Sequence, residues 1–261
     1  MSPNLRNQGI VQTMSHCRFS QVWKFFKVAD PDDLAARLKK GDPGYDPKFW
    51  YRPFYEAVQE ALIRNFVAGG YCVMDEYMQA SAHRIHYQRV MLGKPNDHGL
   101  LWYIMAGVKD FFDESGKQIT GATLYIPLRF DLYTADEPWR RVPGARGGRG
   151  KPPPEYRGYG EGGCFLVRFI AVLMWNGVIK RGTTIIGDRL FTSVKLLRHL
   201  GNLGLNYIGT AKKNSKGIPH FAALKKSAAR GACSFKAVKN LPGLVMGWWR
   251  DSTWVLLMTL G

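Results

Sequence analysis

The sequence predicts an α/β protein in which helices flank a mixed β-sheet, with an N-terminal helical segment before the sheet and a Gly/Pro/Arg-rich insertion within it. Three observations predict this class. Apolar residues recur at helical spacing before residue 67, short apolar or β-branched runs follow, and a Gly/Pro/Arg-rich stretch interrupts those runs. With 261 residues and 46% hydrophobic content, the chain can bury a sizeable core.

The N-terminal region, residues 1–67, is predicted to be helical. Residues 31–33 (Pro-Asp-Asp) are typical of a helix start. Apolar residues at 54, 58, 62 and 66 are spaced by four, which predicts a helix over 53–67 that ends before the glycines at 69 and 70. We therefore divide the chain into a helical region, 1–67, and a sheet-containing region, 68–261.

The second region alternates between predicted strands and helices. Three strands come first, then a flexible insertion at 139–163, and then further helices and strands. The predicted strands are 71–75, 100–108, 122–130, 183–187, 205–210 and 254–259, and the predicted helices are 165–177 and 193–203. Trp175, in the first of these helices, is expected in the core. Three neighbouring strands, a helix and another strand form the arrangement of an RNase H-like fold.

Two aspartates end apolar runs in this pattern, Asp75 after the first predicted strand and Asp188 after the fourth. A strand that stops at an acid is expected to deliver that acid to the rim of a sheet, where ligands gather. Carboxylate oxygens suit Mg²⁺ or Mn²⁺, and metal ions of this kind assist reactions at phosphodiesters. The alternative is that each Asp only caps a turn or helix, because Phe191-Thr192-Ser193 is typical of a helix start.

The charge balance favours nucleic acid as the partner. Thirty-seven Lys and Arg face 20 Asp and Glu, which gives a formal net charge of +17. A membrane surface is the competing interpretation, but no apolar run approaches the roughly 20 residues of a spanning helix.

Six cations follow the acidic strands and are candidate contacts to DNA phosphates, with a solvated face as the alternative. They are Arg84, Arg89, Lys94, Lys212, Lys213 and Lys216.

Cysteine usage favours a reducing compartment. The four cysteines lie far apart without a Cys-x-x-Cys pair, which argues against a zinc module and against a disulfide framework. We therefore expect reduced thiols in the nucleus or cytosol, with the nucleus preferred for a DNA-binding protein, and no small-molecule cofactor.

Five blocks of the sequence occur in an order that resembles the DDE domain of piggyBac-type transposases and of the cellular proteins derived from them. The resemblance covers roughly residues 50–261, and five ordered blocks are far more specific than any single motif. The blocks are Val73-Met74-Asp75-Glu76, Gly93-Lys94-Pro95-Asn96-Asp97-His98-Gly99-Leu100-Leu101-Trp102, Gly187-Asp188-Arg189-Leu190-Phe191-Thr192-Ser193, Tyr207-Ile208-Gly209-Thr210-Ala211-Lys212-Lys213-Asn214 with Gly217-Ile218-Pro219, and Trp249-Arg250-Asp251-Ser252-Thr253-Trp254-Val255.

The resemblance implies a Mg²⁺-dependent dimer that hydrolyses DNA at transposon ends, forms and resolves hairpins, and joins the element to a TTAA target. Asp75 and Asp188 would be the first two acids of the catalytic triad. The family's third Asp lies further along than Gly261, as does its cysteine-rich zinc domain, so the domain is expected to be C-terminally incomplete. Glu76 is a poor substitute because adjacent strand residues point to opposite faces. Asp251 matches a family position that is not catalytic, so we expect it in a turn or a surface contact.

Three hypotheses follow from these observations. The chain is a truncated piggyBac-type transposase with weak or absent strand transfer, a domesticated DNA-binding protein that kept the fold without the chemistry, or an RNase H-like nuclease that uses two acids and one ion. Activity on RNA–DNA hybrids would favour the last of these.

Overall fold

The computed structural model describes residues 14–25, 28–39, 42–81, 87–93, 95–112, 115, 118–134, 154–213, 228–239 and 242–261. The chain divides into two compact units, Met1–Val58 and Gln59–Gly261. The dividing point falls inside helix α3 (Arg52–Asn65). The predicted regions 1–67 and 68–261 therefore stay a prediction about domains.

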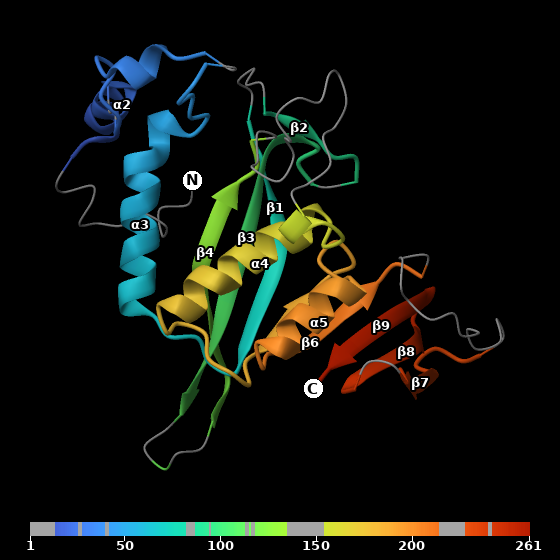
Figure 1. Ribbon diagram of the computed structural model, residues 1–261. Coiled ribbons are helices and arrows are strands. Elements are labelled where there is room, and N and C mark those ends of the chain that lie inside the picture. Colours follow the sequence, from blue (N-terminus) through green and yellow to red (C-terminus); the bar gives the residue numbers. More distant parts are fainter. Residues whose placement is uncertain are drawn as a thin grey trace. The chain divides into compact units, whose positions relative to one another are not determined.

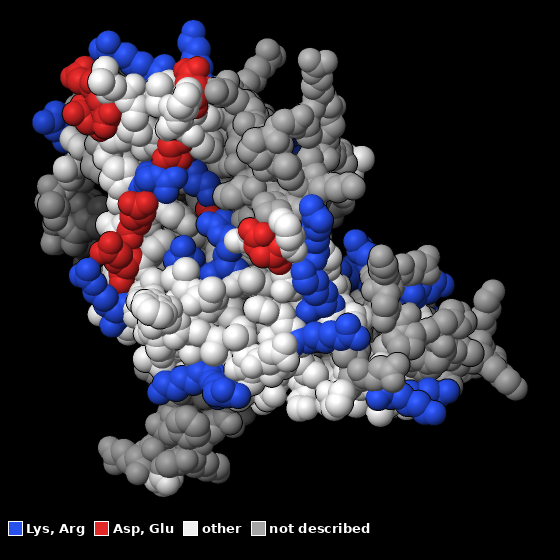
Figure 2. Space-filling view, viewed as in Figure 1, with Lys and Arg blue, Asp and Glu red and all other residues white. Residues whose placement is uncertain are grey.

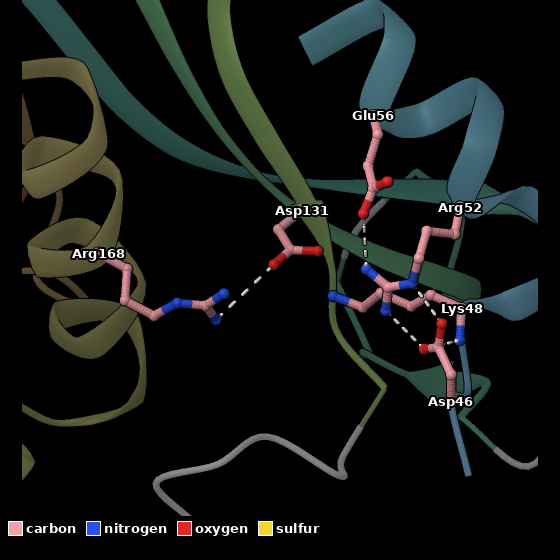
Figure 3. Close-up of polar contacts among 6 residues, drawn as sticks. All are labelled: Asp46, Lys48, Arg52, Glu56, Asp131 and Arg168. Atoms are coloured by element: carbon pink, nitrogen blue, oxygen red, sulfur yellow. Dashed lines mark hydrogen bonds and ion pairs between the residues drawn. The ribbon is translucent and has the colours of Figure 1, made fainter. Parts of the chain in front are cut away.

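The first unit contains short helical elements. They are α2 (His16–Phe25), η2 (Leu34–Arg37), η3 (Phe49–Tyr51) and the start of α3. The Asp33 side chain caps η2 by accepting the Ala35 N–H, so the predicted start at 31–33 opens a single 3₁₀ turn rather than a long helix. At the start of α3, the Arg52 guanidinium lies between two carboxylates (Figure 3), with Nη2 2.6 Å from Asp46 Oδ1 and Nη1 3.2 Å from Glu56 Oε1.

The second unit is built on a nine-stranded mixed sheet with the order β2-β3-β1-β5-β6-β9-β8-β7, in which β4 pairs with β3. The β1–β5 and β5–β6 pairs are parallel, whereas the other pairs are antiparallel. The strands are β1 (Tyr71–Ala80), β2 (Arg89–Val90), β3 (His98–Phe112), β4 (Gln118–Leu132), β5 (Thr184–Gly187), β6 (Asn206–Ala211), β7 (Cys233–Ala237), β8 (Leu244–Arg250) and β9 (Trp254–Leu260). The section β4-β3-β1-β5-β6 is the predicted RNase H-like arrangement, and the prediction of a mixed α/β fold is confirmed.

Helices α4 (Glu161–Trp175) and α5 (Val194–Asn202) lie across one face of this sheet (Figure 1). Alternation along β1 turns Cys72 and Met74 towards these helices, where both side chains are almost fully buried. On α4, buried residues recur at helical spacing and complete the core, and they include Phe165, Phe169 and Leu173. We call this side of the sheet the covered face.

Two details of α4 differ from the sequence-based expectation. The helix begins at Glu161 rather than at 165, so the described part of the predicted insertion, 154–163, contains η5 (Pro154–Tyr156), a turn and the first residues of α4. The rest of that insertion, 139–153, lies outside the described residues. Trp175 is 90% exposed, so the prediction that it lies in the core is wrong. The buried stripe passes through Leu173, and Trp175 lies two residues further on, which rotates it away from the sheet.

The C-terminal strands contain two elements that the sequence did not predict, β7 and β8. They pair with one another and, through β8, with the predicted strand β9. Asp251 lies in the turn between β8 and β9, where its Oδ1 accepts a hydrogen bond of 2.8 Å from Arg230 Nε. The expectation of a turn or surface contact for Asp251 is confirmed.

All four cysteines are free thiols. Burial raises the pKa of Cys72 to about 12, and burial is also the main cause that raises the pKa of Cys164 to about 12. Among the helices of the described ranges, none combines the length and the apolar composition that crossing a bilayer requires.

Candidate metal and nucleic-acid site

Asp75 lies in the middle of β1, so the prediction that it ends the strand is wrong. The strand continues to Ala80 because β3 pairs with it from Cys72 to Ala80. Only the parallel pairing with β5 stops, at Met74 opposite Gly187. Asp75 is therefore the first residue of β1 beyond the end of β5.

Asp188 is the first residue beyond β5, one position past the Met74–Gly187 pair. If the parallel register is extended by one residue, Asp188 falls opposite Asp75, at the roughly 5 Å spacing of neighbouring strands. Both side chains also fall on the same face. Met74 and Gly187 are buried on the covered face, so alternation turns the next residue of each strand to the opposite side. The structure thus brings the two predicted acids together, Asp75 exposed and Asp188 half-buried.

The backbone around Asp188 is fixed by a compact set of hydrogen bonds. Its Oδ1 accepts the Leu190 N–H at 2.7 Å, and its carbonyl accepts the Phe191 N–H at 3.1 Å and the Thr192 hydroxyl at 2.9 Å. Ser193 then caps α5 by accepting the Leu196 N–H. The turn-forming interpretation of Asp188 is therefore correct, and it coexists with a carboxylate on the open side of the sheet.

The carboxylate of Asp75 has a simpler environment. Its Oδ1 accepts the N–H of Glu76 at 2.8 Å. Glu76 itself pairs in register with Tyr103 on the covered face, as the alternation argument predicted. Glu76 therefore does not supply a third acid beside Asp75 and Asp188.

The donor set of the Asp75–Asp188 pair fits a hard divalent cation. Carboxylate oxygens are the preferred ligands of Mg²⁺, which commonly uses one or two of them and takes its remaining ligands from water and phosphate. Within the described ranges, no group of three or more His, Cys, Asp or Glu side chains could hold a metal. The pair can thus anchor an ion that shares its coordination with a phosphate.

Two of the predicted cations lie at the same edge of the sheet as Asp188. Lys212 and Lys213 are exposed and follow β6, whose Gly209 pairs with Gly187 at the end of β5. Parallel strands end at a common edge, so both lysines flank the acids. Arg84, Lys94 and Lys216 fall outside the described residues.

Arg89, the third predicted cation that the structure describes, lies on β2. Its guanidinium lies over the Tyr133 ring, 4.2 Å from the centroid. Basic side chains also spread over the side of the molecule on which α4 and α5 lie (Figure 2). Lys180 and Arg181, in the connection from α4 to β5, and Arg198, on α5, are all exposed. Cations are therefore not confined to the edge that holds the acids.

The sequence did not reveal a polar cluster under the covered face. Glu161, at the first position of α4, accepts hydrogen bonds from the hydroxyls of Tyr103 (3.2 Å) and Tyr133 (3.5 Å). Burial first, and then the Glu161 charge, raise the pKa of Tyr103 well above its usual value, so its hydroxyl stays protonated and can donate. Nearby, Arg168 of α4 points to the buried Asp131 of β4 (Figure 3), with Nη1 3.8 Å from Oδ2.

Comparison with known proteins places this arrangement in a family. The sequence matches the model of the Transposase IS4 family over residues 1–111 and 166–260. Its structure is similar to the one described as "Cryo-EM structure of piggyBac transposase synaptic complex with hairpin DNA (SNHP)", with a TM-score of 0.64 and 18% sequence identity. That likeness covers 99% of this chain and 47% of the other, so this chain spans about half the length of the transposase. A search of curated proteins finds none that matches.

The family match covers both acidic strands and the strands that pair with them. The chain therefore belongs to the Transposase IS4 family and carries a piggyBac-type DDE transposase domain.

Proposed function

We propose that this domain binds DNA and holds a divalent metal ion between Asp75 and Asp188, an arrangement inherited from metal-dependent DNA cleavage and strand transfer. The observation that carries the proposal is the register of β1 with β5, which sets the two acids at neighbouring positions on the open side of the sheet. Two carboxylates at neighbouring positions can both offer oxygen ligands to one ion.

The DDE family implies a divalent metal requirement, and Mg²⁺ or Mn²⁺ is the ion that we propose. When bound, such an ion would supply charge neutralisation at a phosphodiester. The residues of this chain have separate tasks. Asp75 and Asp188 hold the ion, whereas Lys212 and Lys213 attract the DNA backbone to the same edge of the sheet.

Duplex DNA is the proposed partner because a net charge of +17 and cations beside the acids favour a polyanion. The structural neighbour was itself solved in a synaptic complex with hairpin DNA. A nuclear location and a homodimer accord with this function, and both are part of the proposal.

Catalysis by these 261 residues is proposed to be impaired. Two carboxylates bring two negative charges against the four positive charges of a two-metal site, so a second ion would depend on DNA phosphates for its ligands. We expect DNA binding with weak or absent strand transfer.

The deciding experiment compares the unchanged chain with Asp75→Asn and Asp188→Asn, using a hairpin-ended DNA duplex and Mn²⁺. Each substitution should abolish saturable Mn²⁺ binding, measured by electron paramagnetic resonance of the free ion, and should remove any residual DNA nicking. Asp251→Asn, which alters an acid in the β8–β9 turn, is the matched control and should keep the ion. Mn²⁺ binding that is the same in all four proteins would refute the proposal.

A second experiment tests the DNA contact. Replacing Lys212 and Lys213 by Ala should lower the slope of log affinity against log salt by about 2, because about one counterion is released per phosphate contact. The double change Lys180→Ala and Arg181→Ala removes equal charge before β5, at the opposite end of the strand, and should alter the slope less. Equal changes in slope would indicate non-specific attraction over the whole surface.

The second candidate function is that of a domesticated DNA-binding protein without chemistry. The cations that spread over α4 and α5, away from the acids, favour it. DNA binding that persists unchanged without metal and in Asp75→Asn and Asp188→Asn would support this function over the first.

A further inference from the structure

The Asp188 segment is tied to the neighbouring strand β6 through two hydroxyl groups. The Thr192 hydroxyl donates to the Asp188 carbonyl at 2.9 Å, and the hydroxyls of Thr192 and Tyr207 lie 2.7 Å apart. A threonine hydroxyl has one proton, and Asp188 takes it, so Tyr207 must be the donor in the second bond. The chain of hydrogen bonds therefore runs from the Tyr207 hydroxyl to the Thr192 hydroxyl and on to the backbone carbonyl of Asp188.

This chain of hydrogen bonds is fully enclosed. Tyr207 is 0% exposed and Thr192 is 5% exposed. Hydrogen bonds in a dry, low-dielectric interior are electrostatically stronger than in water, and successive bonds polarise one another. Tyr207 and Thr192 thus form a rigid link between the start of β6 and the Asp188 turn at the end of β5.

Two glycines make room for the link. A Cβ at Gly187 would lie 2.7 Å from the Tyr207 hydroxyl, and one at Gly209 would lie 2.6 Å from it. Both distances are shorter than real contacts allow, so any side chain at either position would displace the Tyr207 ring. These glycines pair with one another across β5 and β6, and Gly187 immediately precedes the acid.

We propose that Thr192 and Tyr207 are positioning residues for Asp188: they fix its peptide unit and thereby aim its carboxylate beside Asp75. The inference rests on the proposed metal-binding function and deepens it. Neither residue touches the ion. Their hydrogen bonds hold the backbone carbonyl of Asp188, while the Leu190 N–H holds Oδ1 of its carboxylate, so the acid is constrained at both ends.

The test separates positioning from ordinary stability. Thr192→Val keeps the shape of the side chain but leaves the buried Tyr207 hydroxyl without its acceptor, so it should lower both the melting temperature and the affinity for Mn²⁺. Adding Tyr207→Phe replaces both partners with apolar groups, which restores much of the stability. The double variant should nevertheless bind Mn²⁺ roughly tenfold more weakly than the unchanged chain, as expected when support behind a metal ligand is lost.

Two controls sharpen the result. Thr192→Ser keeps the hydroxyl and should keep the Mn²⁺ affinity, and Tyr125→Phe removes a hydroxyl from an exposed tyrosine of β4 and should change nothing. Hydrogen exchange at the Leu190 amide gives an independent readout, because loosening of the Asp188 turn should accelerate it in the double variant.

The Mn²⁺ affinities of these variants distinguish failure of the positioning role from failure of the metal site. If Asp75→Asn and Asp188→Asn abolish Mn²⁺ binding while the double variant binds within about twofold of the unchanged chain, the positioning role is wrong and the metal site stands. If the two acid variants bind Mn²⁺ as well as the unchanged chain does, the metal site is wrong and the positioning role fails with it.

Discussion

The two faces of the central sheet differ sharply although the same strands build both. On β1, Cys72 and Met74 are almost fully buried beneath α4 and α5, whereas Tyr71 and Tyr77 on the other face are 49% and 54% exposed. Asp75 belongs to this second, open face. Residues adjacent in sequence thus experience opposite environments.

The two-residue period of a strand therefore puts the residues that stabilise the fold on one face and the candidate ligands on the other. The covered face holds the core that fixes the register, and the register in turn sets the acids side by side. Changes on the covered face should therefore unfold the domain, while changes on the open face should spare the fold and alter ligand binding.

The greatest loss of stability is expected at one of two neighbouring isoleucines on β5. Ile185 is fully buried on the covered face, so Ile185→Ala should cost about 2–5 kcal/mol of unfolding free energy. Ile186 is half-buried on the open face, so Ile186→Ala should cost only about 1 kcal/mol. Urea unfolding measures both, and equal losses would contradict the contrast between the faces.

The next effect concerns the space beneath Gly187. Gly187→Ala introduces a Cβ 2.7 Å from the Tyr207 hydroxyl and should destabilise the domain by about 1–3 kcal/mol through overpacking. At Gly70, just before β1, a Cβ would meet no atom within 4 Å. Gly70→Ala should therefore change stability by less than about 0.5 kcal/mol. Thermal unfolding of the two variants is the measurement, and a Gly187→Ala protein as stable as the original would show that Tyr207 can move.

A third comparison uses ion pairs. Asp131 is buried on the sheet beside Arg168, so Arg168→Met should cost about 1–3 kcal/mol because a buried carboxylate loses a charged neighbour. The exposed pair of Arg64 and Glu60 on α3 should contribute only about 0.3–0.5 kcal/mol. Denaturant midpoints of Arg168→Met and Arg64→Met give the two values, and a smaller loss for Arg168→Met would show that other contacts hold Asp131.

The smallest effect is a pH dependence from His199 of α5. Burial, with a smaller effect of Lys195, lowers the pKa of His199 below its usual value. As the pH falls from about 6.5, the unfolded chain takes up the proton first, so stability is present above that pH and declines below it. Because the ring is partly exposed, we expect a loss under about 0.5 kcal/mol. His199→Gln should flatten the stability curve between pH 7 and 5, and an unchanged curve would contradict the assignment.

Much of the fold followed from sequence pattern, because apolar runs marked β3, β4, β5 and β6 and helical spacing marked α4 and α5. The continuation of β1 past Asp75 did not, since Glu76 to Ala80 carry polar residues and are held as a strand by pairing with β3. Likewise β7, which is mostly exposed, is a strand only through its pairing with β8. Pairing between distant segments is not encoded in local periodicity.

The candidate site divides in the same way. Asp75 and Asp188 were predicted because each ends an apolar run, and the pairing of β1 with β5 brings them together. The hydrogen bonds that hold the Asp188 turn were not predicted. The bond between Tyr207 and Thr192 forms only because β6 lies against β5 and because two glycines leave room for the Tyr207 ring. The catalytic and metal-binding roles of the acids, and the DNA role of the six cations, stay predictions.

The spacing of the two acids has a consequence for divergence. Because the register of β1 and β5 sets them at matching positions just past the last hydrogen-bonded pair, their separation follows the spacing of neighbouring strands, which varies little with sequence. Surrounding side chains can drift while that separation persists.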